Sequence, residues 1–438
     1  RTPDGRNTWE LGGGDGDFRW PERPVLILER LALPDAHIRF TGPRLGKPLD
    51  LHFSGLAQER GNDGMLVLAG RGSANETGFE MRASAGPVEA LIAGRDFRLA
   101  LDTRLGELTV AARASIDDLA HPADSRLLLT LRGPDARYLA NRFAVRDLGA
   151  GPLRLDASVV PRKNGRGLAA TLSGDIGAFR VKASGRLDAP LTLQDLAFEL
   201  EASGPDVSLV GGLVGVNRLP RTPFDLQLVV DRQGERLRIR DGLLELPDSR
   251  FELKGEFERI GKLEGSEVDF RLEGSDVARF RELLRLPGLA EGPFKLAGRV
   301  YRSPAGADRL EIDATTALGS FSLSGDLSPK ADWQGTRLSF EAAGPSLARV
   351  GRAADFAGLP DAQFSAAGEF ELQAASLDFR DSMLKVADNA FAWSGQVGKA
   401  PLGRDTDLRF SLKGQDLRDL AALAGRSDLP GSPYQVQG

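Results

Sequence analysis

Three histidines and scattered acids are the residues of this 438-residue chain whose types suit metal binding or acid–base chemistry. His37, His52 and His121 share no metal-ligand spacing with one another or with carboxylates, so the sequence predicts no metal site. The chain has no cysteine, which excludes a thiolate nucleophile, and it has no G-x-S-x-G elbow. We therefore predict no catalytic residue, no metal and no cofactor.

Other motifs that resemble sites are better interpreted as surface turns. The glycine-rich cluster at residues 12–16 is not followed by Lys-Ser or Lys-Thr, so it is not a phosphate-binding loop. Asp15 and Asp17 are interpreted as part of a surface turn rather than as cation ligands, and the pair Asp117 and Asp118 as solvated turn residues. The triplet at residues 75–77 matches a glycosylation sequon, a pattern that is common by chance.

Composition limits the possible classes of function. A hydrophobic content of 41% with 27% charged residues is typical of a folded chain. The net charge of -5 comes from mixed acids and bases without a basic stripe, so nucleic acid is not an expected partner. No run of 18 apolar residues occurs. Because the chain opens without methionine and stops early in a repeat, we expect a hydrophobic helix upstream and more repeat downstream in the natural protein.

The elements that organise the chain recur with a period of 70 or 71 residues. One column holds glycines before an expected helix, at Gly133, Gly204, Gly274, Gly344 and Gly414. A second column holds residues that favour the helix N-cap, at Asp135, Asp206, Asp276, Ser346 and Asp416. A third column holds an aromatic residue or leucine after the helix, at Leu153, Phe224, Phe294, Phe364 and Tyr434. A repeat of this kind predicts an array rather than separate globules.

Each repeat is expected to contain one helix and about four strands. The helices are predicted near residues 135–148, 206–218, 276–286, 346–357 and 416–425. Strands such as residues 251–254 alternate apolar and charged side chains, which indicates an antiparallel sheet with one wet face. Residues 25–118 show the strand and turn spacing of an antiparallel meander.

The predicted fold is mainly β, an elongated antiparallel sheet curled into a groove and built from repeats of about 70 residues. The predicted organisation is an N-terminal β region at residues 1–118, followed by an array at 119–438 with approximate repeats 119–190, 191–262, 263–332, 333–402 and a partial one at 403–438. One short helix per repeat cannot cover the apolar face. Either a second sheet packs on that face or the sheet curls into a trough that holds an apolar ligand.

The motifs resemble those of the AsmA family. Residues 5–11, GRNTWEL, are similar to a GxxNW-type turn near the start of AsmA-family proteins. The repeated pattern F-x-L-x-G-x-D-L, L-P, P-F-x-L-x-G, followed by L-G-x-F-x-L-x-G as in residues 318–325, is similar to the body of the same family. The long run of near-identical repeats departs from the family pattern, so the resemblance leaves the subfamily open.

The resemblance implies a bridge-like lipid-transfer protein with a β-groove. It implies a periplasmic body in a Gram-negative bacterium, anchored to the inner membrane by an N-terminal helix that this sequence lacks. It also implies that phospholipids travel between the inner and outer membranes and so support outer-membrane biogenesis, with inner- or outer-membrane proteins as candidate partners.

Twelve apolar residues are predicted to line the groove: Phe179, Val181, Phe224, Leu226, Phe251, Leu253, Phe294, Leu296, Phe321, Leu323, Phe391 and Trp393. An ordinary core beneath the helices is the alternative place for these side chains, and the sequence does not decide between the two. A lipid conduit is the favoured function. A cell-envelope scaffold or assembly factor without a lipid route and a glycan-processing enzyme on a β-solenoid are the alternatives; the latter would need clustered inward carboxylates.

Overall fold

A computed structural model shows that the chain is mainly β, with 68% of residues in strands and 8% in helices. The strands belong to an antiparallel sheet of 25 strands that does not close into a barrel, which is consistent with a curled groove. The predicted fold class is thereby confirmed. The structure describes residues 30–40, 49–61, 63–75, 77–119, 124–137, 150–163, 167–188, 195–209, 219–259, 265–284, 289, 291–303, 308–328, 333–355, 358–398, 406–418 and 431–438.

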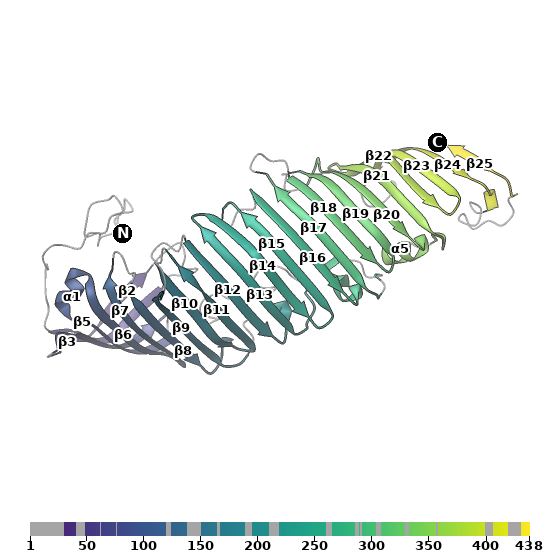
Figure 1. Cartoon of the computed structure of the whole chain (residues 1–438). Coiled ribbons are helices and arrows are strands. Elements are labelled where there is room, and N and C mark those ends of the chain that lie inside the picture. Colours follow the sequence, from purple (N-terminus) through teal and green to yellow (C-terminus); the bar gives the residue numbers. More distant parts are fainter. Residues whose placement is uncertain are drawn as a thin grey trace. The chain divides into compact units, whose positions relative to one another are not determined.

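The chain forms two compact units, residues 1–204 and 205–438. From β3 onward, the strands of each unit lie side by side in chain order (Figure 1). The described elements of the first unit are β1 (Arg30–Leu33), β2 (Ala36–Phe40), β3 (Leu49–Arg60), β4 (Leu66–Ala74), β5 (Thr77–Gly86), α1 (Val88–Ala93), β6 (Arg95–Leu105), β7 (Leu108–Asp118), β8 (Arg126–Gly133), β9 (Leu153–Pro161), β10 (Leu168–Ile176), β11 (Phe179–Leu187) and β12 (Asp195–Gly204).

The described elements of the second unit are β13 (Phe224–Gln233), β14 (Arg236–Leu246), β15 (Ser249–Phe257), β16 (Ser266–Gly274), the 3-10 helix η1 (Val277–Phe280), α4 (Arg281–Leu284), β17 (Phe294–Arg302), β18 (Asp308–Thr316), β19 (Gly319–Leu327), β20 (Arg337–Gly344), α5 (Leu347–Ala353), β21 (Phe364–Leu372), β22 (Ser376–Val386), β23 (Asn389–Gly398), β24 (Asp407–Gly414) and β25 (Tyr434–Gln437). Each strand from β13 to β24 pairs antiparallel with the next one along the chain. Thirteen strands at about 4.8 Å spacing make this unit about 58 Å across its strands.

The first unit begins with two short strands that lie along one edge of the same neighbour. Arg30 of β1 pairs with Glu59 of β3, and Ala36 of β2 pairs with Phe53 of β3. From β3 to β12 every strand then pairs with its successor. The expected antiparallel meander is therefore present in the described part of residues 25–118.

The predicted N-caps are confirmed at all five positions. The cap side chain accepts a hydrogen bond from a backbone N–H in the first helical turn, which otherwise lacks a partner. The donors and distances are Arg137 to Asp135 at 2.9 Å, Ser208 to Asp206 at 2.9 Å, Ala278 to Asp276 at 3.0 Å, Arg349 to Ser346 at 3.2 Å and Arg418 to Asp416 at 2.9 Å. The predicted continuations of these helices at residues 138–148, 210–218, 285–286, 356–357 and 419–425 lie outside the described residues.

A second hydrogen bond repeats with the same period. The N–H of the first residue after each cap donates to a backbone carbonyl two residues before the next strand. The pairs are Ala136 to Gly151 at 2.8 Å, Val207 to Thr222 at 2.9 Å, Val277 to Gly292 at 3.0 Å, Leu347 to Ala362 at 3.0 Å and Leu417 to Ser432 at 3.0 Å. This bond closes the base of each crossover, so the helix is held where one strand ends and the next begins.

Small closed cores form at these crossovers. Val277 and Phe280 of η1 are buried against Phe294, at the start of β17, and Leu318, in the turn between β18 and β19. Ala136 is buried against Leu108 and Leu153 in the first unit. We call this edge of the sheet, where the capped helices sit, the helical margin. The opposite strand ends form the hairpin margin. In Figure 1, α5 marks the helical margin at the ends of β20 and β21.

Candidate functional site

The candidate site is the apolar face of the sheet. In β17, Phe294, Leu296 and Val300 lie on one face, whereas Lys295 and Arg299 lie on the other and are exposed. Residues paired across strands share a face, so the apolar face continues from one strand to the next. Leu296, for example, pairs with Leu272 of β16 and with Ala314 of β18.

Between its two margins this face has no second layer within the described residues. Buried apolar side chains lie at the helical margin and, in the first unit, also at the hairpin margin, at Phe97, Leu168 and Leu187. The principal contacts of every strand are with its neighbours in the sheet, and no second sheet packs against it in the part of the chain that the structure describes. Leu253, Leu272, Leu296, Ile312 and Leu323 lie on this face and remain only half-buried. Of the two arrangements expected from the sequence, packing by a second sheet is therefore wrong for these residues.

The first unit has the same open face with aliphatic side chains. Leu99 of β6 pairs with Ala114 of β7, and Ala114 pairs in turn with Leu127 of β8. The exposed fractions are 40% for Leu99, 40% for Leu127 and 38% for Leu129. Large apolar side chains that are this exposed in the middle of a sheet face indicate a surface that meets an apolar partner.

The twelve residues predicted to line a groove fall into two groups. Phe179, Phe224 and Phe294 are buried, and Phe294 belongs to the core beneath η1. Phe321 is half-buried and packs against that same core. The remaining eight lie half-buried on the apolar face: Val181, Leu226, Phe251, Leu253, Leu296, Leu323, Phe391 and Trp393. Four of the twelve therefore lie in or against closed cores or are buried, and eight lie half-buried on the apolar face; the prediction that these eight line a groove stays a prediction.

Sequence reasoning missed several apolar residues of the same face. Phe340 pairs with Leu323, and Phe410 pairs with Trp393, so each extends a predicted column onto the next strand. The signal was present, because Phe270, Phe340 and Phe410 are each 70 residues apart. Phe370 and Phe379 have no such column and depend on the strand register for their place opposite each other.

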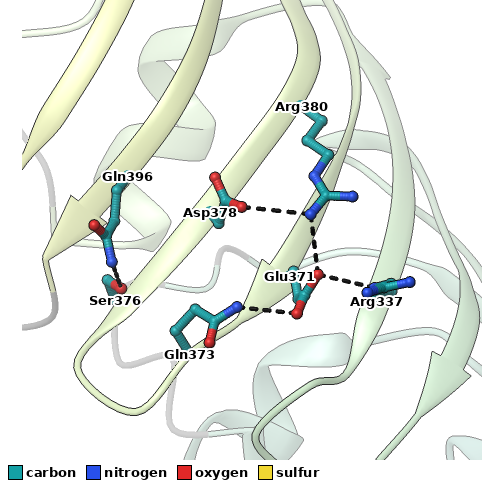
Figure 2. A network of polar contacts seen from close by, with 7 residues as sticks. All are labelled: Arg337, Glu371, Gln373, Ser376, Asp378, Arg380 and Gln396. Atoms are coloured by element: carbon teal, nitrogen blue, oxygen red, sulfur yellow. Dashed lines mark hydrogen bonds and ion pairs between the residues drawn. The ribbon is translucent and has the colours of Figure 1, made fainter.

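The polar face is held together by ion pairs between neighbouring strands. At the hairpin margin of β20, β21 and β22, Glu371 accepts hydrogen bonds from Arg337 at 2.8 Å, Arg380 at 3.1 Å and Gln373 at 2.9 Å (Figure 2). The hydrogen bond from Arg337 is the main cause that holds the pKa of the Glu371 carboxyl below its ordinary value. The carboxylate is thus ionised at neutral pH and joins three strands.

The residues that could do acid–base chemistry form surface pairs. His37 lies 3.1 Å from Asp50, and His52 lies 2.8 Å from Asp35, with all four side chains at least one-third exposed. His121 and residues 12–17 lie outside the described residues. Among the residues that the structure describes, no group of three His, Asp or Glu side chains could hold a metal ion.

Asp117 differs from its predicted role as a solvated turn residue. It lies at the end of β7, where its carboxylate accepts hydrogen bonds from Ser125 and from the N–H of Asp124 at 3.0 Å. Its role is to close the connection to β8.

In the described part of the chain, no helix has the length and apolar character needed to cross a membrane.

Comparison of the chain with protein-family models, with curated proteins and with solved structures finds no match. The resemblance to the AsmA family therefore rests on the sequence motifs alone. The structure shows an apolar surface that runs across neighbouring strands of each unit. Capped helices border it on one margin, and a charged, ion-paired face lies on the other side of the sheet.

Proposed function

We propose that this chain is the periplasmic body of an AsmA-like protein that shields phospholipid acyl chains on the apolar face of its sheet. The observation that carries the proposal is the uncovered apolar face, which continues across neighbouring strands within each unit. The motifs of residues 5–11 and 318–325 support the family. The role is transport of phospholipid between the inner and outer membranes of a Gram-negative bacterium, in support of outer-membrane biogenesis.

The energetics of lipid transfer explain why such a face is useful. Burying acyl chain contributes about 0.8 kcal/mol per CH₂, so a phospholipid with two chains resists passage through water by roughly 20 kcal/mol or more. A continuous apolar surface replaces water around the chains and lowers that barrier without any chemical step. We therefore propose no catalytic activity. Anchoring by an N-terminal helix and contact with proteins of either membrane are part of the same proposal.

Lipid analysis of the purified protein tests this function. The protein is expressed in a Gram-negative host, purified without detergent and extracted for mass spectrometry. We expect phospholipid to be recovered in amounts comparable with the protein. Leu323→Glu should reduce the recovered lipid, because it puts a charge on the apolar face, while Ser324→Glu on the exposed face of the same strand should not.

A folded protein that carries no phospholipid would overturn the conduit. That result would favour the alternative of a cell-envelope scaffold, which needs the repeats and the helix caps but no lipid.

A further inference from the structure

Six aromatic side chains form a continuous stripe over five neighbouring strands of the second unit. The aromatic stripe consists of Phe340 on β20, Phe370 on β21, Phe379 on β22, Phe391 and Trp393 on β23, and Phe410 on β24. The ring centroids are 6.3 Å apart for Phe340–Phe370, 6.0 Å for Phe370–Phe379, 6.0 Å for Phe379–Trp393, 5.3 Å for Phe391–Trp393 and 6.0 Å for Phe391–Phe410. Each ring thus contacts the next one across the strands.

The stripe lies on the open apolar face and is accessible to solvent. Phe340 pairs with Leu323, which places the stripe beside the half-buried column of the preceding strand. Five of the rings are half-buried, and Phe410 is 37% exposed. These rings are therefore not the centre of a closed core, in contrast to Phe280 and Phe294 beneath η1, which are both 6% exposed.

The stripe carries no charge on its own face. The described residues that share this face on β20 to β24 are apolar residues and glycine, together with Ser382 and Asn389. Ser382 is buried and donates its hydroxyl to the carbonyl of Arg380 at 3.1 Å. By contrast, β17 and β18 put Arg302 and Asp308 on the apolar face at the hairpin margin, 2.9 Å apart. A neutral surface suits hydrocarbon and offers nothing to a charged headgroup.

The length of the stripe suits one acyl chain. Five strands at about 4.8 Å spacing give about 19 Å between the first and the last strand. One acyl chain spans about 15 Å, half of the roughly 30 Å hydrocarbon core of a bilayer. A chain laid across the strands would contact the rings one after another, whereas a chain laid along a single strand would meet one or two of them.

We propose that the aromatic stripe is a subsite for one phospholipid acyl chain, which lies across β20 to β24 with its headgroup outside the stripe. The inference rests on the proposed function, and it adds where one acyl chain binds and how that chain runs relative to the strands. The hydrocarbon contacts the ring faces of Phe340, Phe370, Phe379, Trp393 and Phe410 in turn. The headgroup stays away from this stretch because it has no partner there.

Tryptophan fluorescence tests the location of the chain. The sequence has four tryptophans, so replacing Trp9, Trp20 and Trp333 by phenylalanine leaves Trp393 as the only emitter. The probes are phosphatidylcholine vesicles with bromines at carbons 6 and 7 of one chain, and vesicles with a spin label on the choline. We expect the chain bromines to quench at least half of the Trp393 emission and the headgroup label to quench much less.

A matched control puts the emitter on the other face. Met383 of β22 is 42% exposed on the polar face, and the protein with Trp393→Phe and Met383→Trp should show no quenching by the bromines. Quenching of Trp393 by the headgroup label as strong as by the bromines would overturn the proposed placement. Phospholipid that copurifies without bromine quenching of Trp393 would overturn the subsite while leaving the proposed function. Absence of bound phospholipid would overturn both.

Substitutions at the two ends of the stripe test its direction. Phe340→Ala and Phe410→Ala should each weaken phosphatidylcholine binding roughly tenfold, since each removes one apolar contact of the same chain. Tyr301→Ala, an exposed aromatic on the polar face of β17, should leave binding unchanged. A loss for only one of the two end variants, with both still folded by hydrogen exchange, would show that the chain does not lie across the strands.

Discussion

Arg240 and Arg380 occupy the same place in repeats that are 140 residues apart, and each crosses to a carboxylate on the preceding strand. Arg240 donates to Asp231 of β13, and Arg380 donates to Glu371 of β21 at 3.1 Å. Each arginine lies in a β-bulge, where the register shifts between Ile239 and Gly242 in one case and between Phe379 and Ser382 in the other. The regular strand β18 lies between them in the sequence, so alternate repeats carry the bulge.

This arrangement has a mechanical consequence. A bulge adds a residue to one strand and increases its local bend and twist. The arginine then ties the bulged strand to its neighbour on the polar face. In the second unit each bulge occurs together with an arginine–carboxylate ion pair. We interpret this combination as the feature that sets the curvature of the sheet and thereby the shape of its apolar face.

Removing the Glu371 charge should weaken this tie in a pH-dependent way. The pKa of Glu371 is lowered in the folded chain, chiefly by Arg337, so its contribution to stability is present at neutral pH and is lost as the pH falls through the folded-state value. Glu371→Gln should cost about 1–3 kcal/mol at pH 7. The difference from the unchanged protein should shrink as the pH falls below about 4.5.

The measurement is hydrogen exchange of β20 to β22 at several pH values. Glu369→Gln, an exposed acid of the same strand and face, is the matched control and should change little. Equal pH dependence in the Glu371→Gln protein and the unchanged protein would contradict the assignment.

The helix caps are expected to act locally. Asp276→Ala should cost about 1 kcal/mol, because the N–H of Ala278 loses the acceptor that it meets at 3.0 Å. In a repeat array the loss should stay near its own repeat. Faster hydrogen exchange at residues 277–284 is the expected signal, and Asp276→Asn should largely restore protection because it keeps a side-chain oxygen acceptor. Exposed Glu273 on β16 is the control position, and an Asp276→Ala protein as protected as Glu273→Ala would count against the cap.

Alanine substitutions of Phe294 and Leu296, two residues apart on β17, should have different effects: the first should mainly reduce stability and the second should mainly reduce lipid binding. Phe294 is 6% exposed in the core beneath η1, so Phe294→Ala should destabilise by about 3–5 kcal/mol. Leu296 is half-buried on the open face, so Leu296→Ala should cost less stability and should reduce the recovered phospholipid. Urea unfolding measures the stability of both variants, and mass spectrometry of extracted lipid measures how much phospholipid each one carries. Similar stability losses for both would place Leu296 in a closed core instead.

Leu323→Glu separates a conduit from a scaffold in the cell. Water reaches this half-buried position on the open face, so the glutamate can stay hydrated and the stability loss should be modest. Hydrocarbon passing over it would meet a charge, so the full-length variant should fail to support the outer membrane. Complementation and thermal stability are measured together, with Ser324→Glu as control. A well-folded Leu323→Glu protein that fully complements would remove this position from the lipid path.

The local structure of the repeats could be predicted from the sequence. The spacing of Gly274, Asp276 and Phe294 predicted a strand end, a capped helix and a new strand. The structure confirms the three features, with β16 ending at Gly274, the Asp276 cap hydrogen bond in place and β17 beginning at Phe294. Alternation in β17 likewise predicted one wet and one apolar face. These features depend on neighbours within a few residues, so residue type and spacing are enough to specify them.

The division between core and open face was decided only by the tertiary structure. Phe224 and Leu226 looked equivalent as members of apolar columns, yet Phe224 is buried near the helical margin and Leu226 is half-buried. The difference depends on what packs over each strand position once the chain is folded, which no local pattern specifies. The stripe from Phe340 to Phe410 depends on strand register in the same way, because rings from five strands meet only after those strands pair.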